Sequence, residues 1–418
     1  MSGIEHEALP ALFRLVPSAK RTGLFSHLNS DRQMFLLEHL PDVVETVLLN
    51  DMAPDDRTHF LEGLPEDARS QILLKLSPEE RRQAFELLSY PENSVGRLMN
   101  PEFLALKAGM TAKQALDYIR WSSEYPEEMV HHAFVIDSRG RYLGDVNLSD
   151  IVLADSESAS IESLMQHRTT SLNVKDDQES AVDYVRKYDR PYVPVVNDDG
   201  ILEGIVTSDD VFDVAEEEAT EDIQQFGGQG ILEHSYFATP IFTILRKRAG
   251  WLSILFVGEL FTGTVLRHYD EAIAQMRYLV YFIPLVISSG GNSGSQAASL
   301  IIRGLAVREI RGRDWSRILG REAIMGIGLG LILGVIGFIR AISWGSSPAV
   351  GVTVALALIG VVAFGAVIGS MLPILFKKIN LDPAISSSPF IASLVDVVGI
   401  LMLFQIAEFI AKRWAGLG

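Results

Sequence analysis

Asp396 is the residue whose type and position most directly suggest chemistry, because it is the single charge in an apolar stretch covering residues 383–407. An aspartate at the centre of a membrane helix costs about 2.5–3.5 kcal/mol on insertion scales, and such residues usually face a protein interior or an aqueous path. At helical spacing, Pro389, Ser393 and Asp396 share one narrow face of small and polar residues. No Lys or Arg lies inside another apolar stretch to pair with Asp396, so the pattern favours an ion pathway over a structural hydrogen bond.

A second apolar stretch, residues 278–302, carries polar and helix-weakening residues near its middle. Gly290 and Gly291 weaken a helix, and Asn292 and Gln296 lie one turn apart. Polar helix at mid-bilayer is tolerated where it is buried in protein or lines a water-filled path. We therefore expect these four residues to line a pore. The alternative is a kinked packing helix in which the small residues permit close approach.

Glu259 is a further acid within an apolar stretch, residues 249–266. Ser253, Thr262 and Thr264 could satisfy its hydrogen bonds, so a functional and a structural role both stay open.

An acidic run covers residues 207–222, with eight acids and no basic residue. Such runs are usually solvated helix faces. This one has no compensating cation and directly precedes the apolar half, and clustered carboxylates suit hard divalent cations. The acids on or beside one helical face are Asp210, Asp213, Glu217, Glu218, Glu221 and Asp222.

Five stretches are long and apolar enough to cross a bilayer, which takes about 20 residues each. They cover residues 249–266, 278–302, 323–339, 348–376 and 383–407. The third contains Gly326, Gly330 and Gly334, whose spacing of four predicts close helix contact.

Charge divides the chain into two halves and orients it. Residues 1–240 carry a net charge of −24 and residues 241–418 one of +7, so a nucleic-acid partner is not expected. The chain has no cysteine, which excludes disulfides and thiolate chemistry.

The distribution of Lys and Arg predicts the orientation in the membrane. Eleven of them flank the apolar stretches on the side of the N-terminal half, and five flank them on the other side. We expect no cleaved signal peptide. The chain is therefore predicted to be a multi-pass protein of the cell (inner) membrane with a cytosolic N-terminus and an outside C-terminus.

The soluble half reads as two regions. Proline recurs at Pro41, Pro54, Pro65, Pro78 and Pro91, mostly followed by acids, as in the first turns of short helices. Residues 94–215 contain a duplication: DYIR and DYVR match, as do GDVNLSD and GIVTSDD. This resembles a tandem CBS-domain pair, with copies at about residues 94–155 and 160–215. The resemblance implies an adenosine nucleotide such as ATP near Thr207 and Asp210, while Asn147 in the first copy departs from the pattern.

The motifs FIPLVISSGGNSGSQ, DPAISSSPFIASLVD and EEATED together make the chain resemble MgtE-type magnesium channels over essentially its whole length. The resemblance implies a multidomain membrane protein. Its parts are an α-helical repeat domain (1–93), α/β tandem CBS domains (94–215), an acidic connecting or plug helix with its linker (216–245) and an all-α five-helix transmembrane domain (246–418).

The resemblance also implies a homodimer with its pore on the two-fold axis. Asp396 matches the aspartate that holds hydrated Mg²⁺ in the family's pore, and Asp382 matches an acid at the cytosolic pore entrance. The acidic run matches residues that bind regulatory Mg²⁺. Further acids that join this regulatory set are Asp177, Glu179 and Asp189, while Asp55 and Asp56 of the helical array could not be aligned.

The expected function is Mg²⁺ uptake, closed by cytosolic Mg²⁺ that neutralises the acidic region, and no enzymatic activity is expected. Two alternatives stay open: a cation-coupled Mg²⁺ exchanger, and a membrane nucleotide sensor that transports nothing. The sequence does not rank Mg²⁺ against Mn²⁺, Co²⁺ or Ni²⁺.

Overall fold

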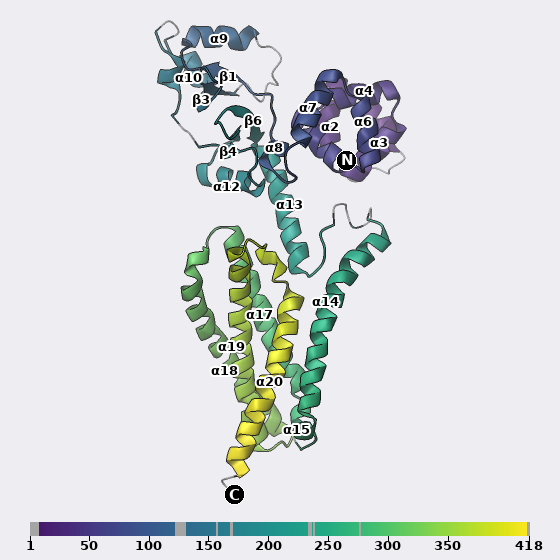
Figure 1. Ribbon diagram of the computed structural model, residues 1–418, viewed down its shortest axis with the longest axis vertical. Coiled ribbons are helices and arrows are strands. Elements are labelled where there is room, and N and C mark those ends of the chain that lie inside the picture. Colours follow the sequence, from purple (N-terminus) through teal and green to yellow (C-terminus); the bar gives the residue numbers. More distant parts are fainter. Residues whose placement is uncertain are drawn as a thin grey trace. The chain divides into compact units, whose positions relative to one another are not determined.

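Short helices build the N-terminal part of the molecule, and the four between residues 42 and 88 begin at proline or acidic residues, as the sequence predicts (Figure 1). The computed structural model describes residues 8–121, 131–155, 158–167, 170–232, 236, 239–275 and 277–415. Pro54 and Pro78 stand in the first turns of their helices, and Pro41 and Pro65 directly precede theirs. The helices are α1 (Leu9–Leu15), α2 (Arg21–Ser26), α3 (Ser30–His39), α4 (Asp42–Asn50), α5 (Pro54–Glu62), α6 (Glu66–Lys75) and α7 (Pro78–Leu88), with a 3-10 turn at Ser18–Lys20.

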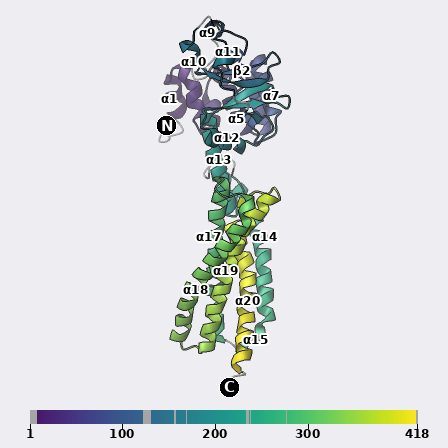
Figure 2. The ribbon, with the colours of Figure 1, turned by 90° about the vertical axis from the view of Figure 1, so that its left-hand side faces the viewer.

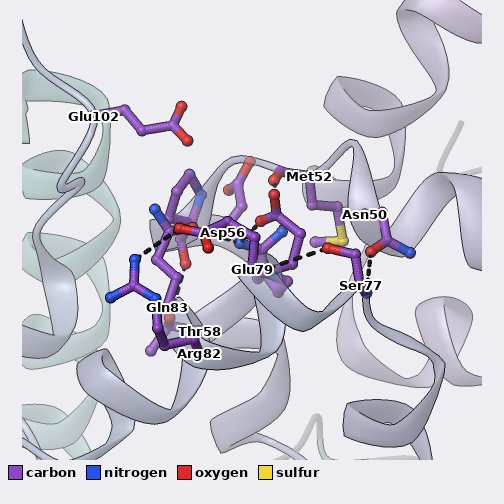
Figure 3. A network of polar contacts seen from close by, with 12 residues as sticks. Asn50, Met52, Asp56, Thr58, Ser77, Glu79, Arg82, Gln83 and Glu102 are labelled. Atoms are coloured by element: carbon purple, nitrogen blue, oxygen red, sulfur yellow. Dashed lines mark hydrogen bonds and ion pairs between the residues drawn. The ribbon is translucent and has the colours of Figure 1, made fainter.

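A buried arginine fixes α5 against α7 in this part. Figure 3 shows a network of polar contacts at these two helices, with Thr58 of α5 and Gln83 of α7 labelled. Arg57 is 1% exposed, forms an ion pair with Glu80, and donates to the Gln83 Oε1 at 2.8 Å and to the Met52 carbonyl at 3.3 Å. Removing one partner of a buried ion pair is strongly destabilising. The contact therefore holds the first turn of α5, and with it the two acids that precede Arg57, in one orientation.

The predicted duplication is present as two equivalent three-stranded sheets. The first has the order β1 (Ala105–Lys107), β2 (His132–Ile136) and β3 (Tyr142–Asn147), and the second has the order β4 (Leu172–Asn173), β5 (Tyr192–Val196) and β6 (Leu202–Thr207). In each, the first pair is parallel and the second antiparallel with one register shift. The helices of this region are α8 (Val95–Leu98), α9 (Ala112–Trp121), α10 (Leu148–Leu153), α11 (Ile161–Leu164) and α12 (Glu179–Tyr188).

Reciprocal backbone hydrogen bonds join the two copies. The Tyr142 N–H donates to the Gly200 carbonyl at 3.1 Å, and the Leu202 N–H donates to the Gly140 carbonyl at 3.1 Å. Both glycines have positive φ values, +82° at Gly140 and +77° at Gly200, a conformation that glycine adopts without strain. Two turns of identical geometry therefore tie the copies together.

The acidic run folds as one helix, α13 (Ser208–Phe226), and the chain divides into two compact units within it, Met1–Glu218 and Ala219–Gly418. The second unit is built of helices (Figures 1 and 2). They are α14 (Ile241–His268), α15 (Asp270–Gln275), α16 (Arg277–Val280), α17 (Ile283–Ala306), α18 (Trp315–Ser343), α19 (Pro348–Lys378) and α20 (Ser388–Ala415), with 3-10 turns at Gly312–Asp314 and Pro383–Ile385.

Four helical segments of the described chain are long and apolar enough to span a membrane, whereas the sequence predicts five spans. They are Ile241–His268, Gly312–Ser343, Pro348–Lys378 and Ser388–Arg413. The remaining predicted span corresponds to α17, which packs against α19 and α20. Its serines, Asn292 and Gln296 lower its hydropathy, so five spans are not established by length and composition.

Backbone contact between glycines joins α17 to α19. A Cβ atom on Gly365 would lie 2.2 Å from the Gly290 carbonyl oxygen, and one on Gly369 would lie 2.0 Å from the Gly294 carbonyl oxygen. Real Cβ atoms do not approach backbone oxygens so closely, so only glycine fits at Gly365 and Gly369. The packing alternative for this segment therefore holds at Gly290, which faces α19 and α20 rather than an open path.

The predicted glycine stripe on α18 also makes close helix contact. Cβ atoms on Gly326 and Gly330 would lie 2.7 and 2.6 Å from the Cα atoms of Ala363 and Ile359 on α19. Gly334 approaches the same helix at Ala355. This prediction is confirmed.

We expect Gly369→Ala to destabilise the membrane unit, because the added methyl group forces α19 away from α17. Overpacking of this kind costs about 1–3 kcal/mol or more. The measurement is the thermal unfolding temperature of the full chain in detergent. Gly328→Ala is the matched control, since a Cβ atom there meets nothing within 4 Å. Equal unfolding temperatures for the two variants would contradict the close contact.

Candidate functional site

Acidic side chains from α5 and α13 converge on one cleft in the N-terminal unit. A cavity of about 100 Å³ and an adjoining one of about 460 Å³ are both lined by Asp55, Asp56 and Asp210, and the smaller one also by Asp213 and Glu217. We call these five residues the acidic cleft. Three of them belong to the predicted acidic run. Asp55 and Asp56 come from the first turn of α5, and the sequence signal for them was the pair of acids directly after Pro54.

Hydrogen bonds orient the carboxylates of α5 in this cleft. The Asn100 side-chain amide donates to both oxygens of Asp55 at 3.2 Å, and the Ser26 hydroxyl donates to Asp56 at 2.8 Å. On the facing element, the Thr207 hydroxyl donates to Asp210. His59 lies 3.9 Å from Glu217, and Arg97 pairs with Glu62 at the cleft wall. The carboxylates are therefore held in place, with one paired cation beside them.

Crowding and burial change the acidity of this cleft. Burial, followed by the charge of Asp56, raises the pKa of Asp55 to about 6. Burial, followed by the charge of Asp55, raises the pKa of Asp210 to about 8. Burial also raises the pKa values of Asp56 and Glu217. Like charges drawn out of water hold protons more tightly, so the cleft favours any cation that can replace those protons.

The other predicted regulatory acids are distributed unevenly. Glu218 accepts a hydrogen bond from the Gln178 side chain at 3.0 Å, which brings the segment of Asp177 and Glu179 beside α13. Glu221 accepts from Gln225 at 2.8 Å on the same helix. Asp222 also lies on α13, beyond the lining of the cleft.

Asp189 does not belong with these acids. It ends α12 in a left-handed conformation, φ 52°, and lines a separate cavity of about 170 Å³ with Asp145 and Arg190. The ten residues of α12 separate it from Glu179 by about 15 Å. In the single chain Asp189 therefore lies outside the acidic cleft, and its place in the regulatory set stays a prediction.

The nucleotide pattern Thr207 and Asp210 forms a helix-entry turn. The Thr207 side chain bonds to Asp210, and in the first copy the Asn147 amide donates to Asp150 at 2.9 Å in the equivalent place. Side chains at turns often bond to the residue three positions on. The pattern thus has a local structural role in both copies.

Within the membrane unit, Asp396 meets a second acid. Its carboxyl group interacts with that of Glu259 on α14, which packs against α20. Both residues are partly buried. In the described part of the chain, neither forms an ion pair with Lys or Arg. Glu259, whose role the sequence leaves open, therefore lies beside the predicted pore acid.

The predicted pore-lining residues separate into two groups. Asn292 and Gln296 are exposed on α17 in the single chain, while Gly290 and Gly291 are buried. A Cβ atom on Gly291 would lie 3.5 Å from the Cα atom of Ala392 on α20. In the single chain the two glycines therefore lie on the face of α17 that packs against its neighbours, and their role in lining a pore stays a prediction.

The remaining predicted residues lie near the start of α20. Asp382 caps the turn Pro383–Ile385 by accepting the Ala384 N–H at 2.8 Å, and Ser393 is partly buried. Pro389 is approached by Gly228, where a Cβ atom would lie 3.1 Å away.

The end of α13 packs onto the membrane helices. Phe226 contacts their apolar core, and Gly228 follows with φ +70°. A Cβ atom on Gly228 would lie 2.7 Å from the Trp251 Nε1 of α14. The acidic helix therefore ends in a tight contact at the starts of α14 and α20.

Metal binding at these sites would rely on bound water. Among residues 8–415, leaving aside those the structure does not describe, no three His, Asp or Glu side chains are arranged to hold one metal ion directly. Mg²⁺ characteristically keeps several waters and uses one or two carboxylates. The acid pairs observed here suit that mode better than they suit a dehydrated ion.

Comparison with known proteins decides the family. A divalent cation transporter family model, MgtE, matches residues 283–406, the MgtE intracellular N domain matches residues 1–93, and CBS domains match residues 95–157 and 161–217. The magnesium transporter MgtE of Thermus thermophilus is 33% identical over 326 residues, which cover 78% of this chain and 72% of that protein. The chain belongs to the MgtE family of magnesium transporters.

Other MgtE proteins are similar to this one. The magnesium transporter MgtE of Bacillus subtilis is 31% identical, over 77% of this chain and 70% of that protein. A crystal structure of the cytosolic domain of the Mg²⁺ channel MgtE in complex with ATP has a TM-score of 0.48 and 29% identity, and covers 51% of this chain and 86% of that one.

We expect Mg²⁺ to stabilise the acidic cleft more at high pH than at low pH. We call the arrangement in which α5 and α13 face each other across the acidic cleft the packed state. Because the pKa values of Asp55 and Asp210 are raised, their protons stabilise this state at low pH, and the stability is lost as the pH rises through about 6 and about 8. Mg²⁺ then competes with fewer protons.

The measurement is protease resistance of the full chain at pH 6 and pH 8.5, with and without Mg²⁺. Protection by Mg²⁺ should be larger at pH 8.5. Asp55→Asn with Asp210→Asn should remove most of the difference. Equal protection at both pH values in the unmodified chain would count against proton and metal competition at this cleft.

Proposed function

We propose that this MgtE family member is a Mg²⁺ channel for uptake that works as a homodimer and closes when cytosolic Mg²⁺ fills the acidic cleft. The observation that carries the transport part is the intramembrane pair of carboxyl groups, Glu259 and Asp396, without a basic partner in the described chain. Carboxylates inside a membrane mark ion pathways when no cation neutralises them. Transport, and no catalysed reaction, is the activity proposed.

The exposed amides of α17 support a path shared between two copies. Asn292 and Gln296 face away from the other helices of their own chain. Amide side chains are unfavourable against lipid tails and favourable against water or another protein surface. A second copy placed against this face would bring two sets of amides and two Asp396 carboxylates around one axis.

The ion chemistry fits Mg²⁺ that keeps its water. Carboxylates can hold a hydrated divalent ion through hydrogen bonds to its water shell, and the attraction doubles with the charge of the ion. A dimer would contribute four carboxyl groups from Glu259 and Asp396. A monovalent ion would gain half as much from them, which supports selectivity for divalent cations.

Charge in the acidic cleft supports closure by Mg²⁺. Asp55, Asp56 and Asp210 repel one another, as their raised pKa values indicate. An ion that binds the packed state more tightly than the open state favours the packed state. Since α13 carries Asp210 and Asp213 and its last residue, Phe226, packs against the apolar core of the membrane helices, one helix links the proposed ion-sensing acids to the membrane unit.

An exchanger is the second candidate, and Glu259 favours it. Coupled transport needs a further titratable or ion-binding group beside the substrate site, and Glu259 provides one next to Asp396. Mg²⁺ flux that requires a sodium or proton gradient would support the exchanger. The nucleotide sensor without transport predicts no flux at all.

We also propose that the CBS domains bind ATP, for which the sequence pattern at Thr207 and Asp210 predicts a place. In the packed state Asp210 faces Asp55, so triphosphate oxygens there would meet like charge. If ATP binds this state, we expect it in the cavity that carries Arg190 instead. Competition between ATP and Mg²⁺ for the cleft would contradict this expectation.

Asp396→Asn should abolish Mg²⁺ flux into liposomes, because it removes the charge that attracts the hydrated ion. Glu259→Gln should reduce flux at low Mg²⁺ by about three- to tenfold, as expected for the loss of about 1 kcal/mol of attraction. Glu408→Gln, an acid farther along α20, is the control and should conduct normally. Undiminished, selective flux through Asp396→Asn would refute the pathway.

Combining Asp56→Asn, Asp213→Asn and Glu217→Gln should leave the protein conducting at millimolar Mg²⁺, because the ion then loses the carboxylates through which it favours the packed, closed state. The measurement is flux against Mg²⁺ on the cytosolic side. Asp189→Asn is the matched control, since Asp189 lies outside the cleft and asparagine tolerates its left-handed backbone. Normal closure in the triple variant would contradict the charge-sensing proposal.

A further inference from the structure

A groove with one basic end lies between the start of α18 and the end of α19. Its volume is about 810 Å³. The apolar wall is a stripe along α19 made by Ile368, Met371, Leu372 and Leu375, whose spacing of three and four puts them on one face over about 10 Å. This stripe belongs to a segment long and apolar enough to span a membrane.

Three cations stand together at one end of the groove. They are Arg313 in the turn before α18, and Lys377 and Lys378 in the last turn of α19. In the described chain none of the three forms an ion pair or a side-chain hydrogen bond. All three residues are exposed, so an anion at this end of the groove can reach them.

Trp315 lies beside these cations and is 53% exposed, and Leu375 on the facing wall is 52% exposed. Tryptophan is enriched where a membrane meets water, with its ring at the level of the lipid headgroups. The groove therefore has its charged end and its indole at headgroup level, and its apolar stripe extends from there along a membrane-spanning helix.

We propose that this groove binds an anionic phospholipid, with the headgroup phosphate on Arg313, Lys377 and Lys378 and an acyl chain along the α19 stripe. Basic pockets between membrane helices recognise anionic headgroups in this way. The charge pattern excludes a neutral lipid as the preferred ligand. A free phosphate ion would use the cations and leave the apolar stripe without an occupant.

The occupied groove would brace the two helices at this end. Beneath it, Ile374 and Met371 pack with Leu305 of α17 and Ile318 of α18 in one small apolar cluster. A lipid that bridges Arg313 to Lys377 therefore joins the turn before α18 to the end of α19. The inference concerns stability and lipid choice, and it does not depend on how Mg²⁺ closes the protein.

The test uses the full chain in detergent with added lipid. Phosphatidylglycerol with brominated acyl chains should quench Trp315, while phosphatidylcholine with the same chains should quench it far less. The chain has five tryptophans, so the Trp315→Phe variant identifies the share of quenching that belongs to this site. Equal quenching by both lipids, or quenching that persists in Trp315→Phe, would overturn the proposal.

Variants separate the two parts of the groove. Arg313→Gln with Lys377→Gln and Lys378→Gln should weaken phosphatidylglycerol binding at least about tenfold, since each basic residue near anionic lipid contributes on the order of 1 kcal/mol. Arg311→Gln with Arg317→Gln and Arg321→Gln removes equal charge outside the groove lining and should bind normally. Equal weakening by both triple variants would refute a built site.

Leu375→Trp fills the apolar stripe and keeps every charge. It should weaken lipid binding but leave the response to inorganic phosphate unchanged. Protection of the chain against thermal unfolding by millimolar inorganic phosphate alone, equal to that by phosphatidylglycerol, would identify a simple anion site and contradict the lipid. The comparison of phosphatidylglycerol with phosphatidylcholine uses the unmodified chain. A folding defect in one of the variants therefore leaves the proposal testable.

Discussion

The contact of glycine backbones between α17 and α19 is the constraint on which the membrane unit depends. Carbonyl oxygens of α17 lie 2.0–2.2 Å from where Cβ atoms on α19 would stand, so the two helices approach closely enough to exclude any side chain there. This approach pulls the small-residue face of α17 inward. Its amides are then left on the opposite, exposed face, and Val395 of α20 packs against Gly290. The location of Asp396, one residue farther along α20, follows from that packing.

A different constraint governs the cytosolic unit, where like charges are brought together and held. Arg57 and Glu80 lock α5 onto α7, and this fixes the direction of Asp55 and Asp56 toward α13. Repulsion between these carboxylates lowers the stability of the fold. Natural proteins keep unfavourable local arrangements of this kind at functional sites. The raised pKa values of Asp55 and Asp210 measure that conflict.

The sequence predicted what depends on local pattern. Proline and acidic first turns gave the short helices, the duplicated motifs gave the two sheets, and the glycines of α18 gave a real helix contact. Glycine composition alone did not distinguish packing from lining at Gly290, because both require a small residue. The difference lies in which neighbour faces it.

Contacts between distant segments were beyond prediction from the sequence. The meeting of Glu259 with Asp396 depends on how α14 packs on α20, and the meeting of Asp55 with Asp210 depends on how the helical array packs on the CBS pair. The position of Asp189 in a separate cavity depends on packing in the same way. Periodicity fixes the face of a helix, but only tertiary packing fixes what that face meets.

The two CBS copies are joined by reciprocal strand-end bonds, whereas α5 touches them chiefly through polar groups: Asp55 with Asn100, and Glu62 with Arg97. When polar groups separate in water, each exchanges its protein partner for water, and little apolar surface is exposed. The contact of α5 would therefore separate without exposing apolar surface, whereas Leu87 of α7 lies in the apolar core of the second copy. The end of α7 thus anchors the helical array to the strand-tied pair, and the polar contact of α5 is the part that water can replace.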